Sequence, residues 1–156
     1  MRAFESLAAL RAAVGEHLGH SPWRRVDQAQ VDAFAEATGD RQWIHIDPDR
    51  AARGPYGGTI AHGFLVLSLL PSFAAEIYRV DGVGMAVNYG LNRVRFPAPV
   101  PTGATVRAGA RLLSAEEVSG GALQVVNEVT VEREGGDKPC CVAETVSRLY
   151  PAPRGA

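Results

Sequence analysis

The sequence predicts an α+β fold, in which an antiparallel sheet packs against one buried helix. Residues 61–78 are apolar on nearly every side, and a helix without a polar face has to be surrounded by protein. The second half of the chain alternates Val and Leu with polar residues between clusters of glycine and proline, which is typical of antiparallel strands. With 156 residues and no visible linker, we expect one domain over residues 1–156.

Residues 1–20 are predicted to form an amphipathic helix that packs on the rest of the domain. Apolar residues recur there at roughly helical spacing, at Phe4, Leu7, Leu10, Val14 and Leu18. We expect His17 and His20 to be solvent-exposed at the end of that helix. The run from Trp23 to Val26 then predicts a short edge strand.

A second helix is predicted over residues 28–38. Asp27, followed three residues later by Gln30, resembles a capping box at its start. Gly39 is a typical residue just beyond a helix end, so we expect the helix to stop there.

Residues 41–58 are expected to form a loop or short turns, because they contain two prolines and several glycines. Within this segment Asp47 precedes Pro48, and proline is favoured at the first position of a helix. Asp47 is therefore expected to cap a short helix at residues 48–52 rather than to take part in chemistry.

The buried helix at residues 61–78 contains Pro71, which removes an internal hydrogen bond. We expect a kink or a restart near residues 67–70. Four strands follow, and their order along the chain predicts an antiparallel meander of Met85–Phe96, Thr105–Val118, Ala122–Arg133 and Cys140–Leu149.

The composition argues against several classes of protein. The formal net charge is -1 and no long block of like charge occurs, which argues against nucleic acid and anionic membranes as partners. The first twenty residues lack the pattern of a signal peptide, and the apolar stretch at residues 64–75 is too short and too interrupted to cross a bilayer. The two cysteines, Cys140 and Cys141, are neighbours and make an awkward disulfide, so we expect a reduced, cytoplasmic setting.

Asp40 and His45 are the first candidates for acid–base chemistry. Five residues apart, they would point in different directions on an α-helix, but they can converge if the chain leaves helical geometry at Gly39. A partly desolvated carboxyl could then accept a proton while the imidazole orients or donates one. The alternative is that Asp40 caps the next turn and His45 bonds to a backbone carbonyl.

Gly63 opens the buried helix and is a candidate oxyanion donor. The first N–H groups of a helix lack internal partners and lie at the positive end of its dipole, so they can stabilise a carbonyl oxygen that becomes anionic. The alternative is that this glycine only permits tight packing. His62 is expected to brace the loop. Metal binding by the histidines and aspartates is disfavoured, because their spacing matches no standard zinc pattern.

Two motifs carry a resemblance to a known family. The stretch from Asp40 to Pro48, DRQWIHIDP, and the stretch from Gly58 to Leu65, GTIAHGFL, resemble the MaoC-like dehydratases, the (R)-specific enoyl-CoA hydratases. The residues QWIH, from Gln42 to His45, and the later stretch LNRVRFPAPV, from Leu91 to Val100, resemble the nodulation-protein-N-like branch.

This resemblance implies a hot-dog fold, in which a curled antiparallel sheet wraps a long central helix, and a homodimer whose two sheets join. It implies that Asp40 and His45 activate a water for addition to C3 of a trans-2-enoyl-CoA or acyl-carrier-protein thioester. Gly63 would hold the thioester oxygen through its N–H group. No metal or organic cofactor is implied, since the coenzyme A thioester is the substrate.

The resemblance also suggests residues that bind the substrate. Ala61 and His62 would shape the turn before the helix, and Phe64 would lie beside the acyl group. Trp43 stands in a motif where many relatives have Asn-Pro, so it could narrow or line the acyl channel. Arg93 and Arg95 would share a strand face and contact the nucleotide phosphates, or else form ordinary salt bridges.

Two alternative functions stay open on the same fold. A hot-dog thioesterase would direct water to the thioester carbonyl, but such enzymes usually depend on a carboxylate on or near the central helix, and Glu76 lies far along it. A non-catalytic acyl-binding subunit would have no need of both Asp40 and His45.

Overall fold

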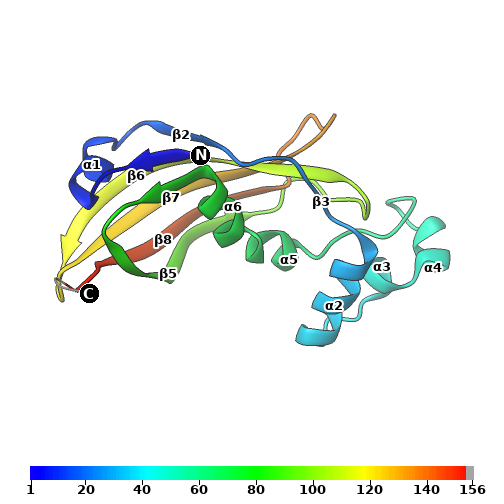
Figure 1. Ribbon diagram of the computed structural model, residues 1–156. Coiled ribbons are helices and arrows are strands. Elements are labelled where there is room, and N and C mark those ends of the chain that lie inside the picture. Colours follow the sequence, from blue (N-terminus) through cyan, green and yellow to red (C-terminus); the bar gives the residue numbers. More distant parts are fainter. Residues whose placement is uncertain (154–156) are drawn as a thin grey trace.

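The computed structural model describes residues 1–153 and contains a curved six-stranded sheet (Figure 1). Five strands lie in the order β2-β6-β7-β8-β5, and the two-residue strand β3 pairs with β6 beside β2. All of these pairings are antiparallel. The strands are β2 (His17–His20), β3 (Arg24–Arg25), β5 (Val83–Arg95), β6 (Thr105–Val118), β7 (Ala122–Arg133) and β8 (Cys141–Pro151).

The predicted meander is correct for β6, β7 and β8 but wrong for β5. Consecutive strands β6, β7 and β8 are neighbours, whereas β5 lies beyond β8, with Met85 opposite Tyr150 and Arg95 opposite Val142. The connection from β5 to β6 therefore crosses the sheet. Alternation of apolar and polar residues identifies a strand but carries no information on which neighbour it pairs with, and this is why the order was missed.

A broken apolar helix packs on the sheet and forms the centre of the core. It consists of α5 (Gly63–Ser68) and α6 (Leu70–Ile77), with the break at Leu69 and Pro71 in the first turn of α6, as predicted. Its buried residues are Leu65, Val66, Leu70, Phe73 and Ile77. The expectation of burial on every side is wrong, since Phe64 is 67% exposed in the single chain and Ser68, Pro71, Ser72 and Ala75 are exposed as well.

The predicted N-terminal helix is largely wrong. Only α1 (Leu7–Ala12) is helical, between strand β1 (Arg2–Phe4) and β2. β1 pairs in parallel with β4 (Tyr78–Val80), and α1 ends at Ala12, before a turn in which Gly15 adopts a φ of 91°. His17 and His20 therefore lie on a strand rather than at a helix end. Phe4, Leu10 and Leu18 still reach the core, from three short elements, whereas Val14 is 45% exposed.

Three helices gather at the end of the sheet remote from α1 (Figure 1). They are α2 (Gln28–Thr38), α3 (Trp43–Ile46) and α4 (Pro48–Ala52). The predicted caps are confirmed: Asp27 accepts a bond from the Gln30 N–H, Gly39 is left-handed with a φ of 78°, and Asp47 accepts a bond from the Arg50 N–H. These local signals place the loop that carries Asp40 and His45.

Within residues 1–153, no helix is long and apolar enough to cross a membrane. The last three residues of the expected domain, 154–156, lie outside the described residues. The α+β arrangement expected from the sequence, a curled antiparallel sheet around a central helix, is confirmed.

Phe73→Ala is expected to lower the free energy of unfolding by about 3–5 kcal/mol, because the ring is fully buried between the helix and the sheet and its loss leaves a cavity. Urea denaturation at a fixed protein concentration measures this loss. Leu113→Ala is the control, since Leu113 is 38% exposed, and it is expected to cost about 1 kcal/mol or less. Equal losses in the two variants would contradict the central role of α6.

Candidate active site

His45 lies at the bottom of the candidate site and is held by the main chain. It comes from the single turn α3 and is 6% exposed. Its Nδ1 atom lies 2.7 Å from the carbonyl oxygen of Ile60. A carbonyl oxygen can only accept, so Nδ1 carries the proton and Nε2 is left with its lone pair. The imidazole is thus fixed in the tautomer whose Nε2 can take a proton.

His62 lies directly against His45. The two rings stack with centroids 3.7 Å apart and planes inclined by 25°, and the Phe34 ring lies 5.0 Å from the His62 ring. The Nε2–H group of His62 donates to the backbone carbonyl of Asp40 at 2.9 Å. His62 is 2% exposed, and its Nδ1 atom has no hydrogen-bond partner among the described residues. The predicted bracing role of this residue agrees with these contacts.

Asp40 completes a cluster of three side chains. One ligand-type atom from each of Asp40, His45 and His62 lies within 4.8 Å of the other two. Asp40 itself is exposed, while both imidazoles are buried. The convergence of Asp40 and His45 that the sequence required is present, because the chain leaves helical geometry at Gly39 before it forms α3.

Gln28 ties the separate segments of the site together. Its amide nitrogen donates to the backbone carbonyl of His45 at 2.8 Å and to Asp32, and its carbonyl oxygen accepts a bond from Thr59 at 2.6 Å. These bonds connect the start of α2 to α3 and to the strand-like segment before His62. Sequence reasoning did not single out Gln28, since its partners are distant in the chain.

The environment lowers the pKa of His45 below 6.5. Desolvation by burial is the largest cause, because it disfavours the charged imidazolium. The bond to the Ile60 carbonyl opposes this shift, the neighbouring His62 adds to it, and the Asp40 carboxylate opposes it. His45 is therefore neutral near pH 7 and able to accept a proton.

A carboxylate and two imidazoles at this distance are also a conceivable set of metal ligands. The stacking opposes that use. The nitrogen lone pairs of two nearly parallel rings lie in the ring planes, so they cannot both point at one ion held between them. Each ring also uses one nitrogen on a main-chain carbonyl. The arrangement suits proton transfer better than metal binding.

Gly63 is the first residue of α5, and its packing explains why a glycine stands there. A Cβ at this position would lie 2.9 Å from the Phe96 ring. The cap residue His62 makes no side-chain bond to the first turn of the helix. The packing role expected for this glycine is therefore real, and its role as an oxyanion donor stays a prediction compatible with it.

Of the other predicted substrate residues, Ala61 and Phe64 flank His62 and Gly63 in the chain, whereas Arg93 and Arg95 lie on β5. Ala61 is buried and its N–H donates to the Val100 carbonyl, while Phe64 meets Phe96 edge-on at 6.1 Å. Arg93 pairs with Glu144 at 2.8 Å, as in the salt-bridge alternative, and Arg95 donates to the Val94 carbonyl. Their predicted contacts with substrate stay predictions.

Trp43 packs toward α4 in the single chain. Its ring lies under the Arg50 guanidinium at 4.6 Å, and it occupies the space that a Cβ on Gly54 would need. It is not among the described residues that line the cavity described next. A part in the acyl channel stays a prediction for this residue.

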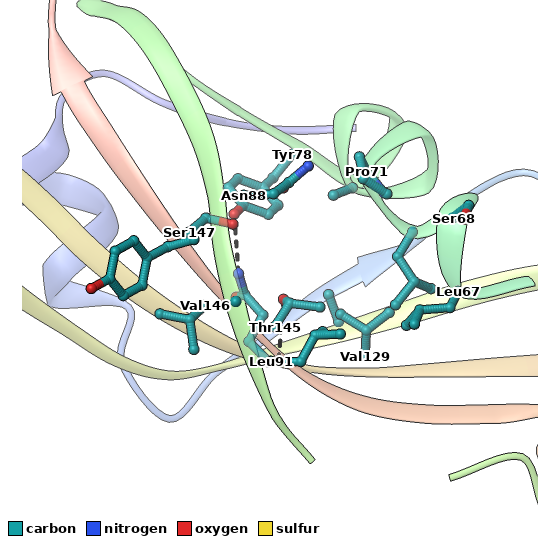
Figure 2. A pocket seen from close by; sticks show the side chains of 16 residues that line it. Leu67, Ser68, Pro71, Tyr78, Asn88, Leu91, Val129, Thr145, Val146 and Ser147 are labelled. Atoms are coloured by element: carbon teal, nitrogen blue, oxygen red, sulfur yellow. Dashed lines mark hydrogen bonds between the residues drawn. The ribbon is translucent and has the colours of Figure 1, made fainter. Parts of the chain in front are cut away.

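A cavity of about 310 Å³ follows α5 and α6 along the concave side of the sheet. Figure 2 shows Ser68, Pro71 and Tyr78 on the helical side and Val129 and Thr145 on the strands. It begins at Leu67, one helical turn beyond Gly63, so the cavity and the Asp40 cluster lie along the same helix. Its volume is at the lower end of ordinary ligand sites. Asn127 also lines it, and the sequence reasoning missed this residue.

Neither cysteine is available as a nucleophile at the Asp40 cluster or in the cavity along α5 and α6. Cys140 and Cys141 are both buried. Cys140 precedes β8 and turns toward the Pro99 carbonyl instead of following the alternation of the strand. Burial raises the pKa of the Cys141 thiol to about 11.

Comparisons with known proteins identify relatives along nearly the whole chain. The family described as MaoC like domain matches residues 9–134. The 3-hydroxyacyl-thioester dehydratase Z of Mycobacterium tuberculosis is 55% identical over 95% of this chain and 98% of its own. Nodulation protein N of Rhizobium leguminosarum bv. viciae is 46% identical over 91% of this chain and 89% of its own.

The chain also has the same fold as proteins whose structures have been solved. The unliganded (R)-hydratase of Pseudomonas aeruginosa superposes with a TM-score of 0.72 at 22% identity, covering 94% of this chain and 86% of that one. At this identity the likeness shows the fold alone, which is the hot-dog fold that the motifs predicted.

The NMR titration midpoint of the His45 ring proton is expected below 6.5, since burial lowers its pKa. In Asp40→Asn the midpoint is expected to fall further, because the carboxylate that raises the pKa of His45 is gone. Asp47→Asn is the control and is expected to leave the midpoint unchanged, since asparagine also caps α4. A midpoint at or above 6.5 in the unaltered protein would contradict the burial argument.

Proposed function

Since the chain belongs to the MaoC-like dehydratase family, we propose that it catalyses the reversible, (R)-specific hydration of trans-2-enoyl thioesters to (3R)-3-hydroxyacyl thioesters. The single observation that carries this proposal is the convergence of Asp40 with a neutral, tautomerically fixed His45. The reaction is that of a lyase in fatty acid metabolism, with coenzyme A or an acyl carrier protein as the carrier. No metal or organic cofactor takes part in it.

Asp40 and His45 act together on one water molecule. The water lies between the carboxylate and Nε2 of His45, and one of these groups takes a proton as the oxygen attacks C3. The pair then returns a proton to C2, so that water is added across the double bond. His45 suits this task because its lowered pKa leaves Nε2 unprotonated near neutral pH. Dehydration runs through the same steps in reverse.

Gly63 stabilises the enolate formed when water adds. Its N–H group belongs to the first turn of α5, where backbone donors have no internal partner. A thioester oxygen there gains negative charge in the transition state and accepts this bond more strongly than in the ground state. Ala61, His62 and Phe64 shape the surroundings of that oxygen. Arg93 and Arg95 supply positive charge for the carrier's phosphates.

The thioesterase alternative is less well supported. The carboxylate on the central helix, Glu76, pairs with Arg24 at 2.6 Å. It lies near the end of α6, at the opposite end of the broken helix from Gly63. A non-catalytic acyl-binding subunit is also less well supported, because it requires no proton-accepting imidazole. The two free, buried cysteines fit the cytoplasmic location that we propose.

Asp40→Asn and His45→Gln are each expected to lower kcat for crotonyl-CoA hydration by about 10²–10⁴, the usual contribution of a general acid or base. Loss of enoyl absorbance measures the rate, and chiral analysis of the product tests the (3R) outcome. Asp47→Asn is the matched control, since Asp47 caps α4 outside the cluster and asparagine replaces it as a cap. Its rate is expected to stay within a factor of about 3.

Unchanged turnover in both cluster variants would overturn the assignment. Release of free thiol from saturated acyl-CoAs without enoyl hydration would favour the thioesterase. Tight acyl-CoA binding with no turnover would favour the binding subunit. Retention of full activity after treatment with a chelator is expected, because the stacked imidazoles suit proton transfer rather than metal binding.

We further propose that two copies of the chain associate through β5. This strand is 13 residues long, lies at one edge of the sheet and is exposed along most of its length. Apolar side chains on and beside it remain uncovered, namely Phe64, Met85, Val87, Tyr89, Leu91 and Phe96. A long, apolar edge strand is an open template for pairing, and an identical strand meets it with matching chemistry.

Size-exclusion chromatography with light scattering is expected to give twice the 16.6 kDa mass of one chain. The double variant Met85→Asp/Val87→Asp is expected to be a monomer at micromolar concentration, because two carboxylates would be buried at the interface. Leu113→Asp, which places one carboxylate on an exposed site of β6, is expected to stay dimeric. A monomeric parent protein, or assembly only with a different chain, would overturn the homodimer.

A further inference from the structure

Asn127 interrupts an otherwise apolar row on β7. The residues of this strand alternate between its two faces, and the buried row consists of Leu123, Val125, Asn127, Val129 and Val131. Asn127 is only 4% exposed, so it stands as deep in the protein as its apolar neighbours. A position of this kind ordinarily holds a valine or leucine, and a buried amide there requires partners for its polar atoms.

The structure supplies only part of those partners. The side-chain nitrogen of Asn127 donates to the Tyr78 hydroxyl at 3.3 Å, while its side-chain oxygen has no partner among the described residues. The Tyr78 hydroxyl accepts that bond and keeps its own proton to donate. If the amide is turned over, the hydroxyl donates to the oxygen and the nitrogen is free instead. Because the amide nitrogen has two N–H groups, the pair keeps at least one free donor and at least one free acceptor in either orientation.

Both side chains line the 310 Å³ cavity along α5 and α6. Tyr78 follows the end of α6 and lines the cavity from the helical side (Figure 2). Two of the other hydroxyls in the lining are occupied, since Ser68 donates to the Phe64 carbonyl and Thr145 donates to the Asn127 carbonyl. The remaining walls include Leu67, Leu70, Leu91, Val129 and Val146. Asn88, Tyr89 and Ser147 also line the cavity, but among the described lining residues Asn127 alone has a buried side-chain atom without a hydrogen-bond partner.

We propose that this cavity takes an acyl chain that carries a hydroxyl group beyond the reacting carbons, and that Asn127 and Tyr78 bind that hydroxyl. A hydroxyl is one donor and one acceptor, which matches what the pair offers in either amide orientation. The inference rests on the hydratase function proposed above. It adds to that function the substrate class, hydroxylated enoyl thioesters in preference to plain alkyl ones.

The position of the cavity fits a group remote from the thioester. Leu67 lies four residues beyond Gly63, about 6 Å along the helix, and Tyr78 lies beyond the end of α6. A chain whose thioester oxygen is held by Gly63 therefore enters the cavity with its distal carbons. The plain chain places a methylene group beside the free amide atom, which stays unpaired, whereas the hydroxylated chain satisfies it.

The test compares trans-2-octenoyl-CoA with three derivatives of it, each hydroxylated at one of the last three carbons. The ratio of kcat/KM between a hydroxylated substrate and the plain one is expected to exceed 1 for at least one isomer in the parent enzyme. In Asn127→Leu this ratio is expected to fall about 5- to 150-fold, the range for leaving a buried hydroxyl without its partner. Leucine restores the apolar row, so the variant is expected to fold.

Two further variants separate binding from general effects. Tyr78→Phe removes the second member of the pair and is expected to lower the same ratio. Gln124→Leu makes a similar change on the opposite face of β7, where Gln124 accepts a bond from Arg148, and is expected to leave the ratio unchanged. A ratio that is unchanged in Asn127→Leu, or a parent enzyme that prefers the plain chain against every isomer, would overturn the proposal.

Calorimetry measures the affinity for octanoyl-CoA and for its hydroxylated derivatives, which are saturated and cannot be hydrated. This measurement keeps the two proposals distinguishable. If hydration fails on every substrate but Asn127→Leu still removes a preference for the hydroxylated ligand, the reaction assigned above is wrong and the hydroxyl site stands. If hydration proceeds and neither ratio responds to the substitution, the reaction stands and the hydroxyl site is wrong.

Discussion

Burial of the broken helix α5–α6 against the concave side of the sheet is the constraint on which the rest of the structure depends. Phe73 and Ile77 are almost completely buried there, and close-packed interiors shift little without losing contacts. The helix is also fixed at both ends, by Gly63 against Phe96 and by the β4 strand that follows Ile77. Its start is therefore held in a definite place relative to the sheet, and the site can be built around that start.

The site itself is oriented mainly by backbone carbonyls rather than by charged side chains. Ile60 fixes the tautomer of His45, and the Asp40 carbonyl takes the proton of His62. Carbonyls orient an imidazole without adding a full charge, so burial can lower the pKa of His45 without an adjacent ion reversing the shift. The exposed Asp40 carboxylate then lies at the open side of the cluster, where water has access. The buried imidazole of His45, which can accept a proton, beside the accessible Asp40 carboxylate is an arrangement suited to activating water.

Features set by local sequence could be predicted, and those set by distant contacts could not. The helix at residues 28–38 and the turn at Pro48 follow from caps within a few residues, and β6 and β7 follow from alternation between strong turn signals. The N-terminal helix failed because pairing of β1 with β4, more than seventy residues away, overrides helical spacing. The stacking of His62 on His45 could not be foreseen, since it depends on how α3 folds back onto the helix start. Asn127 did carry a signal, a polar residue in a row of inward-facing apolar ones, but only once the strand's buried face is known.

Asn127 shows how a local defect in the core can become selectivity. A buried amide atom without a partner costs the free protein about 1–3 kcal/mol. That cost is removed only by a ligand that supplies the missing hydrogen bond. Acyl chains without such a group leave the amide atom unpaired and therefore bind less favourably. Sites built on this principle reject the analogue that lacks the polar group far more strongly than apolar pockets reject an extra methylene. The surrounding leucines and valines of the cavity therefore provide affinity for any acyl chain, while the amide and the phenol decide between chains.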